Sequence, residues 1–180
     1  MSENFKFDSL IKQSWSGVAV LSIFYIVIVI GLSIMSPWFF SFNNAMNIGI
    51  NMSYIGIMAA AGTPLIIAGG LDLSVAAVAG LTGVLITYFF GWIGNIWIAV
   101  VVVMFVGGFI GALNGFLATV LKFNPLIATL GTMSIFTGFS LVLTGGLTKS
   151  MMLPEFNYIG VGRIFNVPIP LIIMLFSMFL

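Results

Sequence analysis

The chain has 180 residues, of which 61% are apolar and only 5% are charged, and its formal net charge is +1. Because an ordinary soluble domain carries about 25% charged residues, this composition excludes a soluble globular domain, and its hydrophobicity excludes intrinsic disorder. The small net charge excludes a nucleic-acid-binding protein, which needs a basic patch. An integral membrane protein remains.

The chain contains neither cysteine nor histidine. Thiolate and imidazole metal sites, disulfides and histidine-based acid–base catalysis are therefore excluded. No phosphate-binding loop of the Walker type is present, so the chain does not hydrolyse ATP alone. We expect no catalytic residue, no metal site and no cofactor.

Long apolar runs predict an all-α fold, a polytopic bundle with five to six transmembrane helices. The runs are continuous rather than alternating, which disfavours a β-barrel. Helices of about 20 residues cross the hydrocarbon core, and most of the runs have that length. The run at 73–90 is short for a straight span and predicts a broken or partly buried helix. Breaks are expected at Ser36–Pro37, in the Asn43–Asn44 region, at Gly69-Gly70-Leu71-Asp72, at Gly91–Trp92 with Gly94–Asn95, and at Lys122-Phe123-Asn124-Pro125. The expected spans are 16–36, 47–69, 73–90, 96–120, 126–145 and 168 onward.

Charged residues predict the orientation in the membrane. Lys6 and Lys12 precede the first span, and the positive-inside rule places them in the cytoplasm. Residues 1–15 then form a cytoplasmic segment, and residues 146–167 form an external loop. The chain stops at Leu180 inside an apolar run, so we expect it to be the N-terminal part of a longer protein.

Asp72 is the only charged residue between Lys12 and Lys122. A charged residue within a membrane span is a functional candidate by default. However, Asp72 follows Gly70 and precedes an apolar run, as a helix N-cap does when it accepts hydrogen bonds from the first free N–H groups. We therefore expect Asp72 and Gly70 to have a structural, capping role. A direct role of Asp72 in proton or ligand binding is the alternative.

Gly107, Gly111 and Gly115 recur every four residues in the fourth expected span. Small residues at this spacing allow another helix to approach closely. The pattern predicts helix packing, with a partner helix either from this chain or from a second copy. Asn114 lies beside this face, and we expect it to hydrogen-bond across helices. Contact with a substrate is the alternative.

Two further segments place unusual residues inside expected spans. Thr63-Pro64 interrupts the second span, where proline removes a backbone hydrogen bond and kinks the helix. Broken helices near the membrane midplane often line a translocation path. Thr129 and Thr132 are small hydroxyl residues, which turn toward protein or toward a water path. A structural kink and helix packing are the simpler interpretations, and a path lined by Thr63, Pro64, Asn114, Thr129 and Thr132 is the alternative.

Three segments resemble a known family when they are taken in order. Residues 69–81 read GGLDLSVAAVAGL, residues 111–115 read GALNG, and residues 124–146 begin NPLIATLGTM and end TGG. They are similar to motifs of the permease subunits of bacterial ABC sugar importers of the ribose, xylose and galactose type, within the branched-chain-permease-like superfamily. Two departures are Ala76, where the family commonly has glycine, and Asn124, where it commonly has proline.

The resemblance implies a permease subunit that forms the translocation path of an ATP-driven importer for a simple sugar, in the bacterial inner membrane. The partners implied are a second permease copy (identical or paired), a cytoplasmic ATP-binding subunit and an external substrate-binding protein, besides the lipid bilayer. ATP hydrolysis is expected on the separate subunit, so the chain itself is not an enzyme. Family members have a second half with more spans, so residues 1–180 are expected to be the N-terminal half of a single permease domain.

Other function classes stay open at this point. A branched-chain amino-acid permease shares the architecture, although a different run is expected there in place of Leu71-Asp72-Leu73-Ser74. A non-transporting membrane scaffold would need no ATPase. An intramembrane enzyme is the weakest alternative, because the long apolar block offers one carboxylate and no second acid.

Overall fold

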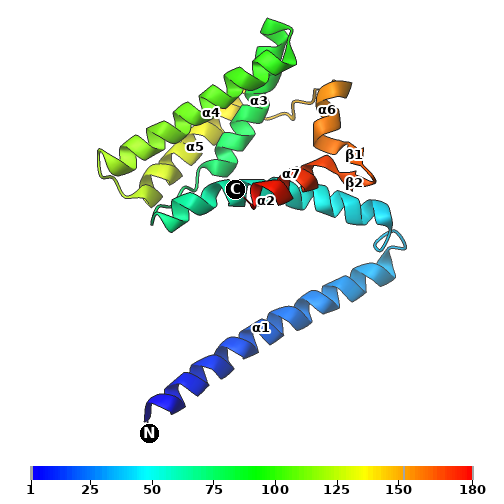
Figure 1. Cartoon of the computed structure of the whole chain (residues 1–180), viewed down its shortest axis with the longest axis vertical. Coiled ribbons are helices and arrows are strands. Elements are labelled where there is room, and N and C mark those ends of the chain that lie inside the picture. The colour runs from blue at the N-terminus through cyan, green and yellow to red at the C-terminus, as the bar shows by residue number, and fades with distance from the viewer. Residues whose placement is uncertain (1, 152, 180) are drawn as a thin grey trace. The chain divides into compact units, whose positions relative to one another are not determined.

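The computed structural model describes residues 2–151 and 153–179 (Figure 1). Two compact units are distinguished, Met1–Ile48 and Gly49–Leu180. Among the described residues, five helices are long and apolar enough to cross a membrane. The all-α, polytopic class expected from the sequence is confirmed. These membrane-length segments are Gly17–Met35, Phe42–Ile67, Val75–Ile93, Ile96–Thr119 and Pro125–Thr144.

The first unit contains α1 (Ser2–Met35) and the beginning of α2 (Phe42–Ile67). The break expected at Asn43–Asn44 is misplaced, because both residues lie in the first turn of α2. The Asn44 backbone N–H donates to Ser41 Oγ at 3.2 Å, and the Asn44 side-chain amide donates to the Phe39 carbonyl at 2.8 Å. These bonds satisfy polar groups at the start of the helix. Asn44 therefore stabilises the first turn of α2 and does not interrupt the helix.

Glycine pairs end two of the helices. Gly69 has a φ of +80°, its N–H donates to the Ile66 carbonyl, and the Gly70 N–H donates to the Leu65 carbonyl at 2.9 Å. This pairing is a Schellman motif, in which a left-handed residue satisfies the last free carbonyls. Gly145 and Gly146 end α5 in the same way. Each pair therefore sets the C-terminus of the helix that precedes it.

In the second unit, α3 (Val75–Ile93), α4 (Ile96–Thr119) and α5 (Pro125–Thr144) pack together as a three-helix bundle (Figure 1). The contacts give the directions of the helices: α4 runs antiparallel to α3, and α3 and α5 are parallel. On α4 the buried apolar side chains are spaced three, four or seven residues apart. They therefore lie on one face, which is directed toward the interior of the bundle, as in an amphipathic helix. The buried apolar residues are Leu81, Ile96, Ala99, Val103 and Ile110.

Two asparagines begin helices of this bundle. Asn95 Oδ1 accepts from the N–H groups of Trp97 and Ile98 at 3.0 and 3.2 Å, and so caps α4. Asn124 Oδ1 accepts from the Leu126 N–H at 2.9 Å. These are N-cap bonds, which satisfy N–H groups that have no partner within the helix.

The short third run was expected to form a broken or partly buried helix, and it forms an unbroken helix in which Leu81 is buried and most of residues 82–90 are half-buried. α3 has 19 residues and continues through Gly91 and Trp92 to Ile93, so the break expected at Gly91–Trp92 with Gly94–Asn95 occurs at the second of these pairs. The helix ends at Gly94, which has a φ of +73°. The turn needs a left-handed residue, and glycine adopts that conformation without strain.

The connection after α5 contains structure that the sequence did not predict. It holds α6 (Pro154–Val161) and a hairpin of β1 (Arg163–Ile164) and β2 (Val167–Pro168). α7 (Ile169–Ser177) follows and runs parallel to α2, with Leu171 near Gly49 and Met174 against Gly56 (Figure 1).

Candidate functional site

The most polar part of the bundle interior lies where α3 begins beside the second half of α4. Asp72 lies two residues before Ser74, which occupies the N-cap position of α3. Asp72 Oδ1 accepts from the Ser74 N–H at 2.7 Å and from the Ser74 hydroxyl at 2.6 Å. The carboxylate thus satisfies a backbone donor just before the helix, at the end that favours negative charge.

Asn114 continues this chain of hydrogen bonds from α4. Its Nδ2 donates to Ser74 Oγ at 2.8 Å. Both side chains are buried, with 5% exposure for Asn114 and 1% for Ser74. Asn114 Oδ1 is buried too and has no hydrogen-bond partner. The cluster of Asp72, Ser74 and Asn114 therefore joins α3 to α4 and leaves one carbonyl oxygen unsatisfied.

Asp72 provides a prediction that separates a cap from a functional carboxylate. Asp72→Asn keeps an oxygen that accepts the Ser74 N–H, so we expect stability and transport to be largely retained. Asp72→Ala removes the acceptor and is expected to cost about 1 kcal/mol of unfolding free energy. The comparison requires detergent unfolding of the purified variants and uptake by cells with matched protein levels. Complete loss of transport in Asp72→Asn at normal abundance would indicate that the carboxylate acts directly.

Gly70 belongs to the end of α2 rather than to the start of α3. A Cβ at this position would lie 2.8 Å from Leu65 Cδ1 and 3.4 Å from the Leu65 carbonyl oxygen. The Schellman hydrogen bond brings the chain this close to Leu65. A side chain at this position would therefore require the Leu65 side chain of the preceding helix to move.

The glycine row on α4 turns gradually out of the bundle. A Cβ on Gly107 would lie 3.7 Å from Thr82 Cγ2 and 4.0 Å from Val78 Cγ1, so this glycine faces α3. A Cβ on Gly111 or on Gly115 would meet nothing within 4 Å. A row spaced by four residues rotates about 40° at each step, which explains why only its first member faces α3.

The hydroxyl residues of α5 lie inside the bundle. Thr129 and Thr132 are 3% and 6% exposed. The Thr129 hydroxyl donates to the Pro125 carbonyl at 2.8 Å, and the Thr132 hydroxyl donates to the Thr129 carbonyl at 3.2 Å. Their hydrogens are thus used within their own helix, as is usual for hydroxyls in apolar surroundings.

Thr63 and Pro64 lie within α2, which continues through both residues to Ile67. The Thr63 hydroxyl donates to the Ala59 carbonyl at 2.9 Å. Such a bond adds a partner for the backbone next to the position where proline removes one. Both side chains are exposed and lie apart from Asp72, Ser74 and Asn114 along the chain.

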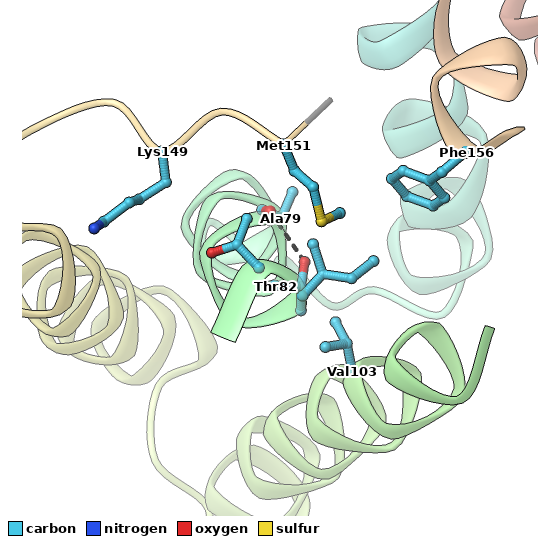
Figure 2. Close-up of a pocket in the computed structure, with 9 residues that line it drawn as sticks. Ala79, Thr82, Val103, Lys149, Met151 and Phe156 are labelled. Atoms are coloured by element: carbon cyan, nitrogen blue, oxygen red, sulfur yellow. Dashed lines mark hydrogen bonds between the residues drawn. The ribbon is translucent and has the colours of Figure 1, made fainter. Parts of the chain in front are cut away.

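An open cavity of about 390 Å³ lies on another face of α3, and the residues that line it are not among those expected from the sequence. One side of the cavity is covered by the segment that leads from α5 into α6. We call this segment the strap, and it comprises residues 147–156 without residue 152. Figure 2 shows Met151 and Phe156 of the strap on one side, with Thr82 and Val103 across from them. The nine lining residues are Ala79, Thr82, Gly83, Ile86, Thr87, Val103, Lys149, Met151 and Phe156.

One end of this cavity is fixed by contacts between α3, α5 and the strap. The Tyr88 hydroxyl donates to the Leu143 carbonyl. The Lys149 ammonium lies 5.8 Å from the centre of the Tyr88 ring, in a cation–π arrangement. The small residues Ala79 and Gly83, four apart on α3, are a signal for a hollow face, but sequence alone cannot show which segment covers it.

The part of the chain that the structure describes has no group of three or more Asp and Glu side chains placed to hold a metal ion. Its polar features are instead the hydrogen-bonded cluster and the strap-covered cavity.

Comparison with known proteins gives matches over most of the chain. A family model described as branched-chain amino acid transport system / permease component matches residues 44–176. The ribose import permease protein RbsC of Escherichia coli (strain K12) is 34% identical over 153 residues, which cover 83% of this chain and 48% of that protein. The L-arabinose transport system permease protein AraH of the same strain is 31% identical over 157 residues, covering 87% and 48%.

A third relative comes from an archaeon. The xylose/arabinose import permease protein XylH of Sulfolobus acidocaldarius is 30% identical over 141 residues, which cover 74% of this chain and 39% of that protein. The chain spans about half the length of the curated bacterial relatives it matches. No solved structure gave a significant match.

Proposed function

Since the chain belongs to the family of branched-chain amino acid transport system permease components, we propose that it forms part of the membrane path of an ATP-driven importer. We propose further that the cargo is a simple sugar, ribose-, xylose- or galactose-like. The observation that carries this proposal is the similarity to permeases named for ribose, L-arabinose and xylose/arabinose.

The direction of the helices supports a multi-pass arrangement. α3 and α5 are parallel, α4 runs against them, and α7 is parallel to α2. Consecutive crossings of a bilayer require this alternation. We propose an inner-membrane location with residues 1–15 in the cytoplasm and residues 146–167 outside, as the positive-inside rule indicates for the N-terminal lysines.

The proposed assembly follows from the same family membership. It consists of a second permease copy, a cytoplasmic ATP-binding subunit that hydrolyses ATP, and an external substrate-binding protein. In such an assembly the bundle of this chain is moved by its partners. We propose that Thr63, Pro64, Asn114, Thr129 and Thr132 line the path, and that this motion uncovers the three of them that are buried in the bundle.

Uptake in cells tests the function. Deletion of the gene is expected to abolish ATP-dependent uptake of at least one labelled monosaccharide from a panel of ribose, arabinose, xylose and galactose, with restoration by the plasmid-borne gene. Labelled leucine belongs in the same panel, because the description of the family names branched-chain amino acid transport. If leucine uptake alone depends on the gene, the sugar assignment is wrong. If no uptake changes while a membrane complex is lost, the chain is a scaffold.

A further inference from the structure

We propose that the cavity beneath the strap is a binding site for a neutral polyhydroxylated solute of monosaccharide size, with Thr82 and Phe156 as specificity-determining residues. This inference rests on the proposed function and adds a site to it. Of the nine lining residues, none is among those expected from the sequence to line a path. The volume of about 390 Å³ lies within the range usual for small-molecule sites.

The hydrogen-bonding capacity of the cavity favours a solute that both donates and accepts. The Thr82 hydroxyl donates to the Ala79 carbonyl at 3.0 Å, and the Thr87 hydroxyl donates to the Val84 carbonyl at 2.8 Å. A hydroxyl has one hydrogen and two lone pairs, so both oxygens can accept but not donate further. The ammonium of Lys149 only donates. A solute carrying several hydroxyl groups matches both kinds of partner.

The charge of the lining argues against other solutes. Lys149 is the one charged residue among the nine described residues that line the cavity. It repels a cation. An anion without hydroxyl groups pairs with Lys149 but offers no hydrogen to the two threonine oxygens, and an anionic sugar is therefore tested beside the neutral ones. A zwitterionic amino acid would bring an ammonium group to a wall on which none of these nine residues is a carboxylate.

The apolar side of the cavity completes the match. Met151 and Phe156 face Thr82 and Val103, whereas the Lys149 side chain extends away from Met151 (Figure 2). A sugar ring has C–H groups on its faces and hydroxyl groups at its rim. The faces pack against an aromatic or thioether side chain, and the rim reaches the polar atoms. Pockets with mostly apolar walls and a few placed polar groups are typical of small-molecule binding.

Variants of Thr82 test the polar part of this site. Thr82→Val removes the hydroxyl but keeps the methyl group that lies near Gly107. We expect it to weaken monosaccharide binding about two- to tenfold, the effect of one hydrogen bond. Thr82→Ser, which keeps the hydroxyl, is expected to bind as the parent does. Thr119→Val is the matched control, because the Thr119 hydroxyl also donates to its own helix, at 2.7 Å from the Gly115 carbonyl, and is not a lining residue.

Variants of Phe156 test the apolar part. Phe156→Ala is expected to weaken binding by a factor of three or more, while Phe156→Tyr keeps the ring and retains binding. Phe165→Ala is the control, because Phe165 lies in the hairpin turn and is 99% exposed. Each variant is first checked for monodispersity by size-exclusion chromatography, so that loss of folding is distinguished from loss of binding.

The measurement is saturation-transfer NMR on the chain in lipid nanodiscs, titrated with ribose, xylose, galactose, leucine and glucuronate. The expected result is sugar binding that is weakened by Thr82→Val and Phe156→Ala and unchanged by both controls. Absence of sugar binding, equal binding by all variants, or preferred binding of leucine or glucuronate would overturn the site. Gene-dependent uptake is measured separately. If sugar uptake requires the gene while the variants bind sugar normally, the proposed function is retained and the proposed site is rejected.

Discussion

Gly107→Leu is expected to lower the free energy of unfolding of the α3–α4–α5 bundle by about 1–3 kcal/mol, as other overpacking substitutions do. A Cβ at Gly107 already lies 3.7 Å from Thr82 Cγ2 and 4.0 Å from Val78 Cγ1. The Cβ is thus already in van der Waals contact with α3, and the remaining carbons of leucine extend beyond it. Folding then requires α3 and α4 to separate, with loss of the contacts around Leu81 and Ile110, which are 2% and 3% exposed.

Gly111→Leu is the matched control for this prediction. The residue is one turn further along the same helix, and a Cβ there meets nothing within 4 Å. We expect a change below about 0.5 kcal/mol, as at other open surface positions. The two variants are compared by titrating purified chain in detergent micelles with SDS and following tryptophan fluorescence. Equal destabilisation by both would contradict the outward turn of the glycine row.

Ser74→Ala is expected to destabilise the chain by about 1–2 kcal/mol, because it leaves the buried Asn114 amide without its partner. In the native chain Asn114 Nδ2 donates to Ser74 Oγ, and Asn114 Oδ1 already lacks a partner. The substitution would thus leave both ends of one buried amide unsatisfied. It would also remove the hydroxyl that donates to Asp72.

Asn114→Leu is the contrasting change at the other end of the same bond. Leucine has a similar shape and no polar atom, so the substitution removes the buried unsatisfied oxygen together with the hydrogen bond. Replacement of an unsatisfied polar group by an apolar one can be neutral or stabilising. We therefore expect the free energy of unfolding of Asn114→Leu to be within about 0.5 kcal/mol of the parent value, or higher, in the same SDS titration. A loss as large as that of Ser74→Ala would show that Asn114 has a further partner, such as a bound water molecule.

Much of the fold follows from patterns that are local in the sequence. The spans expected at 96–120 and 126–145 agree closely with α4 and α5, because long apolar runs end there at residues that cap helices. The extent of α3 was harder to predict. A break was expected at Gly91–Trp92 with Gly94–Asn95, and the helix ends at the second pair, where Gly94 has the left-handed conformation.

The site could be predicted only in part. The composition of 69–74 pointed to a polar helix start at Asp72, and the hydrogen bonds of Asp72 lie at that start. Its functional role stays a prediction, as do the roles of the other candidate residues. The cavity was not predictable, since Phe156 lies on a helix inside a connection that was expected to be a loop. Contact between Phe156 and α3 is tertiary, and no local periodicity reveals such a contact.

The contact of α2 with the end of the chain has a consequence for synthesis. The Tyr54 hydroxyl donates to the Gly160 carbonyl across a separation of 106 residues. At about 5–20 residues per second, the ribosome needs on the order of 5–20 seconds to make that intervening chain. Helices α3, α4 and α5 can meet their neighbours as they emerge, because their contacts are local. The residues of α2 near Gly49, Tyr54 and Gly56 instead meet their partners only after the segment from Gly160 to Met174 has been made.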